Sequence, residues 1–448
     1  MEKNLTTGNV FKTIVYFALP YLLSYFMQTL YGMADLFITG QFDGVDSITA
    51  VSNGSQVMHM LTVIIVGLAM GTTVMVGKAV GSRDKKQASK VIGNTITLFM
   101  IVALVMTGIL LICVKPIVGI MNVPKEAVKE TIGYLAICFA GIPFITAYNI
   151  ISSIFRGLGD SKSPMYFIGI ACVANIALDY LFIGYFDMGA YGAALGTTLS
   201  QTISVIIALV AIKKRDTGIK LSKQDFKIKR NILSEMLKVG MPVAVQDGCI
   251  QIAFIIITII ANQRGINDAA AVGIVEKVIS ALFIVPSSML ATVSALSAQN
   301  IGAGKHKRAA ETLKYATVIT TIYGLVVALV IQFCATFVLK IFTSDAIVIV
   351  MGTQYLKGYV WDAIFAGIHF SFSGFFAAYG KSYIGFLHNI ISITCVRVPG
   401  SYLASKCFKD TLLPMGLAAP AGSFVSVIIC LIAYKIMKKQ FIEENYNE

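Results

Sequence analysis

Two aspartates lie in apolar stretches of the chain, where a charged side chain is unusual. Asp35 directly follows the uncharged stretch 13–34, and Asp179 lies within the apolar stretch 163–186. Burial away from water favours the neutral form of a carboxyl group. Such a group can hold a proton, a sodium ion or a cationic solute, but seldom two of them at once. This mutual exclusion is the chemistry that an antiporter needs.

Uncharged polar side chains are spaced so that they can join these carboxyl groups. Asn175 lies four residues before Asp179, which places both on the same face of a helix. Thr197 lies in the next apolar stretch, and Gln28 lies seven residues before Asp35. Their amide and hydroxyl oxygens could complete a sodium site or a hydrogen-bond network around a protonated acid. In the alternative interpretation, each Asp only accepts hydrogen bonds from a neighbouring helix.

Further charged residues lie in or near apolar stretches, and their roles stay open between structural and functional. Asp247 lies five residues after Pro242 and is expected near the end of its stretch. Glu276 and Lys277 are adjacent, so they point to different sides of a helix and do not form a simple pair. The others are Asp362 and Arg397.

The composition indicates that the elements positioning these residues are membrane-spanning helices. Of the 448 residues, 56% are hydrophobic and only 13% are charged, whereas soluble domains contain about 25% charged residues. Surface-to-volume scaling leaves a soluble protein too much surface to hide so many apolar side chains. The composition therefore excludes a soluble enzyme, a disordered chain, a collagen and a coiled coil.

A helix that spans a bilayer needs about 20 apolar residues, because its backbone polar groups must pair within the helix. Twelve such stretches are present, eight without any Asp, Glu, Lys or Arg and four with a single charge. We therefore expect an all-α polytopic membrane protein with twelve transmembrane helices. The uncharged stretches are 13–34, 47–77, 91–114, 131–155, 188–212, 278–304, 315–339 and 411–434, and those with one charge are 163–186, 239–263, 358–380 and 382–405.

The Lys and Arg residues are distributed unequally between the two sides of this topology. The termini and every second loop hold 26 of them, whereas the opposite loops hold eight. Because positive residues accumulate in cytoplasmic loops, we expect a multi-pass protein of the cell (plasma) membrane with both termini in the cytoplasm. The same distribution explains the net charge of +13, so we expect no nucleic-acid partner.

The two halves of the chain are similar at an offset of 221 residues. Tyr134 then matches Tyr355, and Gly159 matches Gly380. Each half holds six spans, so we expect two six-helix bundles of the same orientation, related by a pseudo-two-fold axis along the membrane normal. The expected division is an N-terminal bundle at residues 1–215, a cytoplasmic linker at 216–234 and a C-terminal bundle at 235–448.

The second half has no carboxylate at the positions that match Asp35 and Asp179. Ile256 or Ile257 matches Asp35, and Gly400 matches Asp179. Motifs for catalysis are also missing, because the four His form no metal-binding motif and no Ser or Cys lies in a nucleophile elbow. We expect neither an enzyme nor a resident metal or cofactor, and H⁺ or Na⁺ as the coupling ion.

At the level of motifs, the chain resembles the bacterial multidrug and toxic compound extrusion (MATE) transporters over nearly its whole length. The resemblance implies a V-shaped cavity between two bundles. It also implies export of cationic or amphipathic drugs and other xenobiotics by alternating access, in exchange for H⁺ or Na⁺. The segments that carry it are Ala18-Leu19-Pro20 with Asp35, and residues 156–162, 175–180, 192–197 and 299–304.

The resemblance also implies roles for individual residues. Other branches of the family use carboxylates in the seventh and tenth spans. Here the seventh-span position is Ile250 or Gln251, and Asp362 lies about one turn from the tenth-span position. We therefore place cation coupling in the N-terminal bundle. The coupling residues are then Asp35, Asn175, Asp179 and Thr197, and the candidates for the substrate cavity are Gln28, Tyr134, Asn149, Glu276 and Asp362.

Two other functions remain open. A flippase for lipid-linked sugars has a related fold, but it should line its cavity with Lys and Arg, and Arg397 is the one clear base within a span. A membrane-embedded transferase would need clustered His, Asp or Ser near an interface. We favour an exporter of small organic compounds that works as a monomer in the lipid bilayer.

Overall fold

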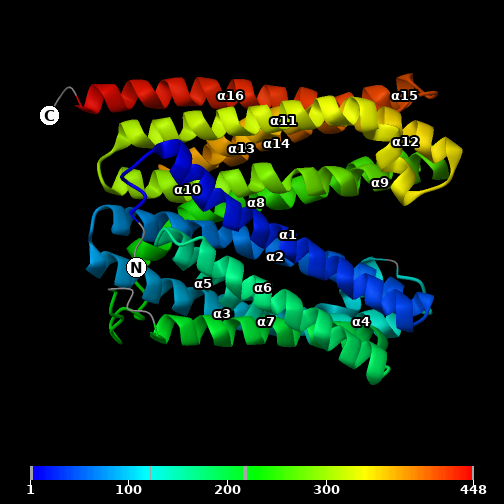
Figure 1. Ribbon diagram of the computed structural model, residues 1–448, viewed down its shortest axis with the longest axis horizontal. Helices are drawn as coiled ribbons and strands as arrows, with labels where there is room; N and C mark the ends of the chain where they lie inside the picture. The colour runs from blue at the N-terminus through cyan, green and yellow to red at the C-terminus, as the bar shows by residue number, and fades with distance from the viewer. Residues whose placement is uncertain (1–3, 122, 215–218, 446–448) are drawn as a thin grey trace. The chain divides into compact units, whose positions relative to one another are not determined.

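The computed structural model describes residues 4–121, 123–214 and 219–445, and within these residues the chain is helical and has no β-strand (Figure 1). The first half forms α1 (Val10–Phe42), α2 (Val45–Gly81), α3 (Lys85–Ile120), α4 (Val128–Ala140), α5 (Ile142–Gly157), α6 (Lys162–Asp179), the π-helical segment η1 (Tyr180–Tyr185) and α7 (Gly189–Lys214). The second half forms α8 (Arg230–Asn262), α9 (Ile266–Leu282), α10 (Ile284–Gly302), α11 (His306–Phe342), α12 (Ala346–Tyr359), α13 (Asp362–Ala378), α14 (Ser382–Ile391), the π-helical segment η2 (Ser392–Arg397), α15 (Val398–Cys407) and α16 (Leu413–Asn445).

Nine helices of the described chain are long and apolar enough to cross a membrane. The number is eleven if two bent pairs each count as one span, namely α4 with α5, bent by 47°, and α12 with α13, bent by 41°. The predicted eleventh span, 382–405, is helical as α14, η2 and α15. The predicted all-α polytopic fold is therefore confirmed, and each predicted span lies mainly on helix.

The described chain divides into two compact units. The first contains Val15–Gly240 and Ala298–Lys305, with the described residues up to Gly8. The second contains Asn9–Ile14, Met241–Ser297 and the described residues from His306. The limits 1–215 and 235–448 stay predictions, and residues 216–218 of the predicted linker lie outside the described residues.

The backbone at the helix ends follows the sequence repeat. Gly159 and Gly380, which match at the offset of 221, have φ angles of +86° and +75°. Arg83 and Gly304 match at the same offset, with φ angles of +60° and +71°. In all four turns, the N–H of the following residue bonds to the carbonyl five positions earlier, at 2.8–2.9 Å. This is the usual way to end a helix with a left-handed residue, so the repeat extends to backbone conformation.

The fifth predicted span of each half contains a π-helical segment. These spans are 163–186 and 382–405. Asp179 directly precedes η1, and Arg397 is the last residue of η2. A π-helical turn interrupts the regular hydrogen bonding of an α-helix and is frequent at functional sites. In both halves, therefore, a charged residue adjoins an irregular turn of the same span.

The described part of the predicted linker lies along α3. The Asn94 side chain donates to the Asp225 carbonyl at 3.0 Å and accepts from the Lys229 N–H at 2.6 Å. Ser89 and Thr97 donate to two further carbonyls of this segment, at 3.1 and 2.9 Å. The segment is thus fixed to the first unit through its backbone.

Candidate functional site

The Asp35 carboxyl group lies in α1 and faces the interior of the first unit. The side chain is 3% exposed, and its Oδ2 accepts a hydrogen bond from the Thr197 hydroxyl of α7 at 3.0 Å. The Asp35 carbonyl accepts a second hydrogen bond, from the Thr39 hydroxyl one turn later, at 2.6 Å. Two helices far apart in the sequence are therefore joined at this carboxyl group.

Asp179 lies at the end of α6 and is completely buried. The backbone of α7 approaches it closely, because a Cβ atom built on Gly196 would lie only 2.2 Å from Asp179 Oδ1. No side chain larger than hydrogen fits at position 196 while the carboxyl group keeps its place. Gly196 therefore lets α7 pack directly against the carboxyl group, and it directly precedes Thr197 in the sequence.

The structure brings the four predicted coupling residues together. The Asp35 carboxyl group interacts with Asp179, Asn175 and Thr197, which come from α6 and α7. Asn175 is completely buried like Asp179. These contacts place Asp35, Asn175, Asp179 and Thr197 in one cluster within the first unit, while their roles in coupling stay predictions.

The polar atoms of this cluster are only partly satisfied. Asp35 Oδ1, both carboxyl oxygens of Asp179 and both amide atoms of Asn175 make no hydrogen bond of good geometry among the described residues, although the Asp179 and Asn175 side chains lie close enough to Asp35 to interact with it. No Lys or Arg of the described chain interacts with either carboxyl group. Two carboxylates this close in an apolar medium cannot both stay charged without a cation or a proton between them. The cluster can therefore bind a proton or a small cation.

Two tyrosine side chains lie near the Asp35 carboxyl group. Tyr31 of α1 and Tyr134 of α4 interact electrostatically with Asp35. Tyr134 is 2% exposed and packs against Gly54, where a Cβ atom would lie 2.2 Å from its ring. The sequence had indicated Tyr134 as a cavity candidate, whereas Tyr31 was missed although it lies one helical turn before Asp35.

The other two cavity candidates of the first half lie outside the carboxyl cluster. Gln28 is half-buried and adjoins Tyr148 of α5. Asn149 is buried and donates to the Ile145 carbonyl of its own helix at 2.8 Å. The structure gives neither side chain a contact with Asp35 or Asp179.

The candidates of the second half form a separate cluster in the second unit. Asp362 begins α13 at the bend after α12, and Glu276 lies in α9. Both carboxyl groups interact with Arg397, while Thr258 of α8 donates to Glu276 at 3.2 Å. Sequence reasoning named the three charged residues separately and did not predict their association.

A family model matches most of the chain, and curated relatives match almost all of it. The model of the family named MatE matches twice, at residues 20–181 and at residues 242–403, which are 222 residues apart in agreement with the internal repeat. The probable multidrug resistance protein YoeA of Bacillus subtilis is 26% identical over 439 residues, which cover 96% of this chain and 95% of that protein. The probable multidrug resistance protein NorM of Thermotoga maritima is 24% identical over 439 residues, covering 96% and 91%.

Solved structures show the same fold. A crystal structure described as MATE in the straight conformation superposes with a TM-score of 0.92 at 23% identity, over 98% of both chains. At this identity the likeness concerns the fold alone. It confirms the predicted arrangement of twelve helices in two bundles.

Proposed function

Because this chain belongs to the multidrug and toxic compound extrusion (MATE) family of efflux transporters, we propose that it exports small organic cations in exchange for H⁺ or Na⁺. It is a multi-pass membrane transporter of the multidrug efflux type and not an enzyme. The observation that carries the proposal is the buried pair Asp35 and Asp179, whose oxygens are largely unpaired and beside which the described part of the chain places no Lys or Arg.

In the proposed cycle, this pair exchanges one positive charge for another. A proton or Na⁺ relieves the repulsion between the two carboxylates, with Thr197 and Asn175 supplying neutral oxygens. An organic cation competes for the same negative charge, so the two are not held together. The half-buried ring of Tyr31 beside Asp35 offers an aromatic face to such a substrate. Alternating access then carries the two cations in opposite directions.

The charge distribution favours this function over a flippase for anionic headgroups. A headgroup site would need several unpaired bases, yet Arg397 shares its surroundings with Asp362 and Glu276. In the first unit, no described Lys or Arg interacts with the carboxyl pair. Both charged clusters therefore attract cations.

We also propose a place and a state for the transporter. The Lys and Arg distribution supports a plasma-membrane location with both termini in the cytoplasm. One chain supplies both halves of the repeat, so a monomer in the lipid bilayer is the proposed functional form.

Transport in reconstituted vesicles tests the proposal. Ethidium is supplied as a fluorescent cation, and a Na⁺ gradient and a pH gradient are imposed separately. We expect ethidium movement against its own gradient with one of the two, and its loss when that gradient is collapsed. Movement that responds to neither gradient would contradict the proposed function.

A further inference from the structure

The second unit contains a buried arginine that the proposed exchange does not use. Arg397 is 7% exposed, and one terminal nitrogen of its guanidinium group donates to the Tyr359 hydroxyl. The guanidinium carbon lies 4.9 Å from the ring centre of Phe254 and 5.5 Å from that of Tyr359. Two aromatic side chains therefore hold this cation in place.

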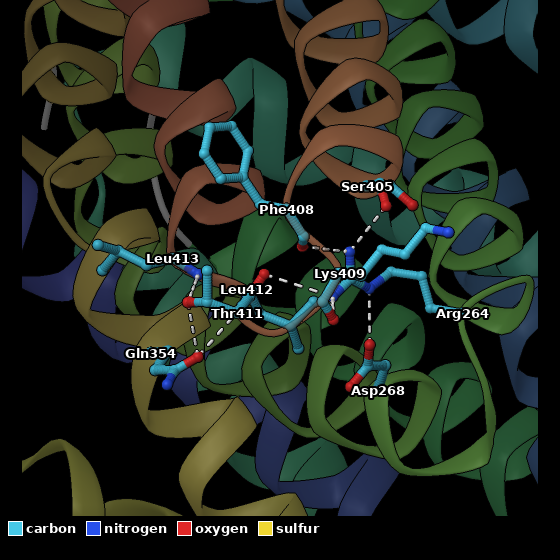
Figure 2. A network of polar contacts seen from close by, with 9 residues as sticks. All are labelled: Arg264, Asp268, Gln354, Ser405, Phe408, Lys409, Thr411, Leu412 and Leu413. Atoms are coloured by element: carbon cyan, nitrogen blue, oxygen red, sulfur yellow. Dashed lines mark hydrogen bonds and ion pairs between the residues drawn. The ribbon is translucent and has the colours of Figure 1, made fainter.

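In another arginine of the same unit, all three nitrogens of the guanidinium group donate hydrogen bonds to the protein. Figure 2 shows Arg264, whose Nε donates to Asp268 at 2.6 Å and whose terminal nitrogens donate to four backbone carbonyls of residues 405–411 at 2.8–3.3 Å. Arg264 thus fixes the end of α15 to the start of α9. The buried Nε of Arg397, by contrast, has no hydrogen-bond partner in the described chain.

Two carboxyl groups lie near Arg397 without a direct ion pair in the described chain. Tyr359, which accepts a hydrogen bond from Arg397, lies three residues before Asp362. Phe254, which packs against the guanidinium group, lies one helical turn before Thr258, the partner of Glu276.

Asp362 is 1% exposed. Its carboxyl group interacts with the Ser423 side chain, although neither oxygen makes a hydrogen bond of good geometry in the described chain. Glu276 accepts from Thr258 through one oxygen, and its other oxygen is buried without a partner there. The remaining titratable groups that interact with Arg397 are Tyr355, Tyr359 and His369, none of which is negatively charged near neutral pH.

The charges of this cluster do not cancel. Two carboxylates and one guanidinium group leave one negative charge for an exchangeable cation to balance. Without the guanidinium group, two negative charges would need exchangeable cations, because a buried carboxylate must be paired or must take up a proton. In the first unit, Asp35 and Asp179 have no such built-in cation among the described residues.

We propose that Arg397 is a tethered counter-ion that takes the place of one exchangeable cation beside Asp362 and Glu276. It thereby sets how many H⁺ or Na⁺ ions the protein binds in each transport cycle. The statement about the cycle rests on the proposed cation coupling, whereas the charge balance of the second unit does not.

Counting bound cations tests this role without transport. Purified protein in detergent is titrated with ²²Na⁺, and the protons taken up or released are measured in the same samples. We expect Arg397→Gln to bind one more monovalent cation per chain, as the sum of H⁺ and Na⁺, than the parent. Arg397→Lys and the double variant Arg397→Gln/Asp362→Asn should bind the parental number. The double variant Arg264→Gln/Asp268→Asn is the matched control, because it removes a buried guanidinium group together with its own acid, so its count should stay parental.

An unchanged count in Arg397→Gln would overturn the proposal. The proposal would also be overturned if the extra cation of Arg397→Gln persisted when Asp362→Asn was added and when Glu276→Gln was added instead. If Arg397→Gln does not fold, the double variant Arg397→Gln/Asp362→Asn tests the proposal instead, because it removes one positive and one negative charge together. Its folding with the parental count supports the counter-ion, whereas its failure to fold shows that Arg397 is needed for its aromatic contacts instead. A failure of ethidium export in vesicles would leave this count unaffected.

Discussion

Five buried polar atoms of Asp35, Asn175 and Asp179 have no hydrogen-bond partner among the described residues. Each such group costs about 1–3 kcal/mol when it is left unpaired in an apolar interior. Such atoms are found where a bound ion, a proton or a ligand supplies the partner that the protein itself does not. At the scale of single residues, we therefore connect the unfilled polar capacity of this cluster with the exchange of a cation.

Gly196 offers a test of this geometry. In Gly196→Ala the new Cβ atom would lie 2.2 Å from Asp179 Oδ1, so the carboxyl group must rotate away. A rotation off its preferred rotamer costs about 1 kcal/mol, which corresponds to roughly fivefold weaker cation binding. We expect gradient-driven export to fall at a normal membrane level of the protein. Gly108→Ala is the control, since that site has open space, and equal export by both variants would contradict the geometry.

At the scale of elements, the turns that end α2 and α10 differ in one residue. Arg83 has a left-handed conformation where the repeat has Gly304. A left-handed conformation costs a residue with a Cβ about 1–2 kcal/mol, and the greater backbone freedom of glycine in the unfolded chain offsets about 0.5–1 kcal/mol of it. We expect Arg83→Gly to raise thermal stability slightly and Gly304→Ala to lower it, as measured by melting in detergent. The opposite order would show that the Arg83 side chain stabilises the turn.

The part of the linker that lies along α3 and contains Asp225 and Lys229 allows a pH-dependent test of its attachment. The Ser222 backbone N–H and hydroxyl donate to Asp225 at 2.8 and 2.7 Å, and these hydrogen bonds lower the pKa of Asp225. The ionised form is therefore the stabilising one. Its contribution is present above the ordinary carboxyl pKa of about 3.9, and it is lost as the pH falls through the lowered value.

Asp225→Asn should thus loosen this segment at neutral pH. We expect faster backbone hydrogen exchange over residues 220–229 in the variant, and an intermediate rate in Ser222→Ala, which keeps the backbone hydrogen bond. Unchanged protection in both variants would mean that the side chain of Asn94 alone holds the segment on α3.

At the scale of the whole molecule, the helices could be predicted because a bilayer-spanning segment must meet strict requirements of length and composition. A span must be long and almost free of charge, so the approximate positions of the spans and the isolated positions of Asp35 and Asp179 could be read from the sequence. The helices run beyond the predicted limits, as α1 does to Phe42. The association of the polar residues could not be read from it, because the hydrogen bond between Thr197 and Asp35 joins residues 162 positions apart. The spacing of the polar residues indicated only that they could join, and the resemblance to MATE transporters implied that they form one site.

The remaining contacts depend on how each helix is rotated about its own axis. A membrane helix is apolar on all sides, so periodicity does not identify the buried face. The approach of Gly196 to Asp179 and the aromatic contacts of Arg397 with Phe254 and Tyr359 therefore left no pattern in the sequence. Neither π-helical segment was predicted, since a single π-helical turn has no apolar pattern that distinguishes it from the α-helix on either side.

The central claim is that cation coupling resides in the carboxyl pair of the first unit. The most direct measurement compares Asp35→Asn, Asp179→Asn and Asp362→Asn for gradient-driven ethidium export at matched levels in vesicles. Each substitution keeps the shape of the side chain and fixes its neutral state. We predict that the first two variants insert normally and lose coupled export, while Asp362→Asn is affected less. Full activity of both first-unit variants, with loss only in Asp362→Asn, would contradict the account and move the coupling site to the second unit.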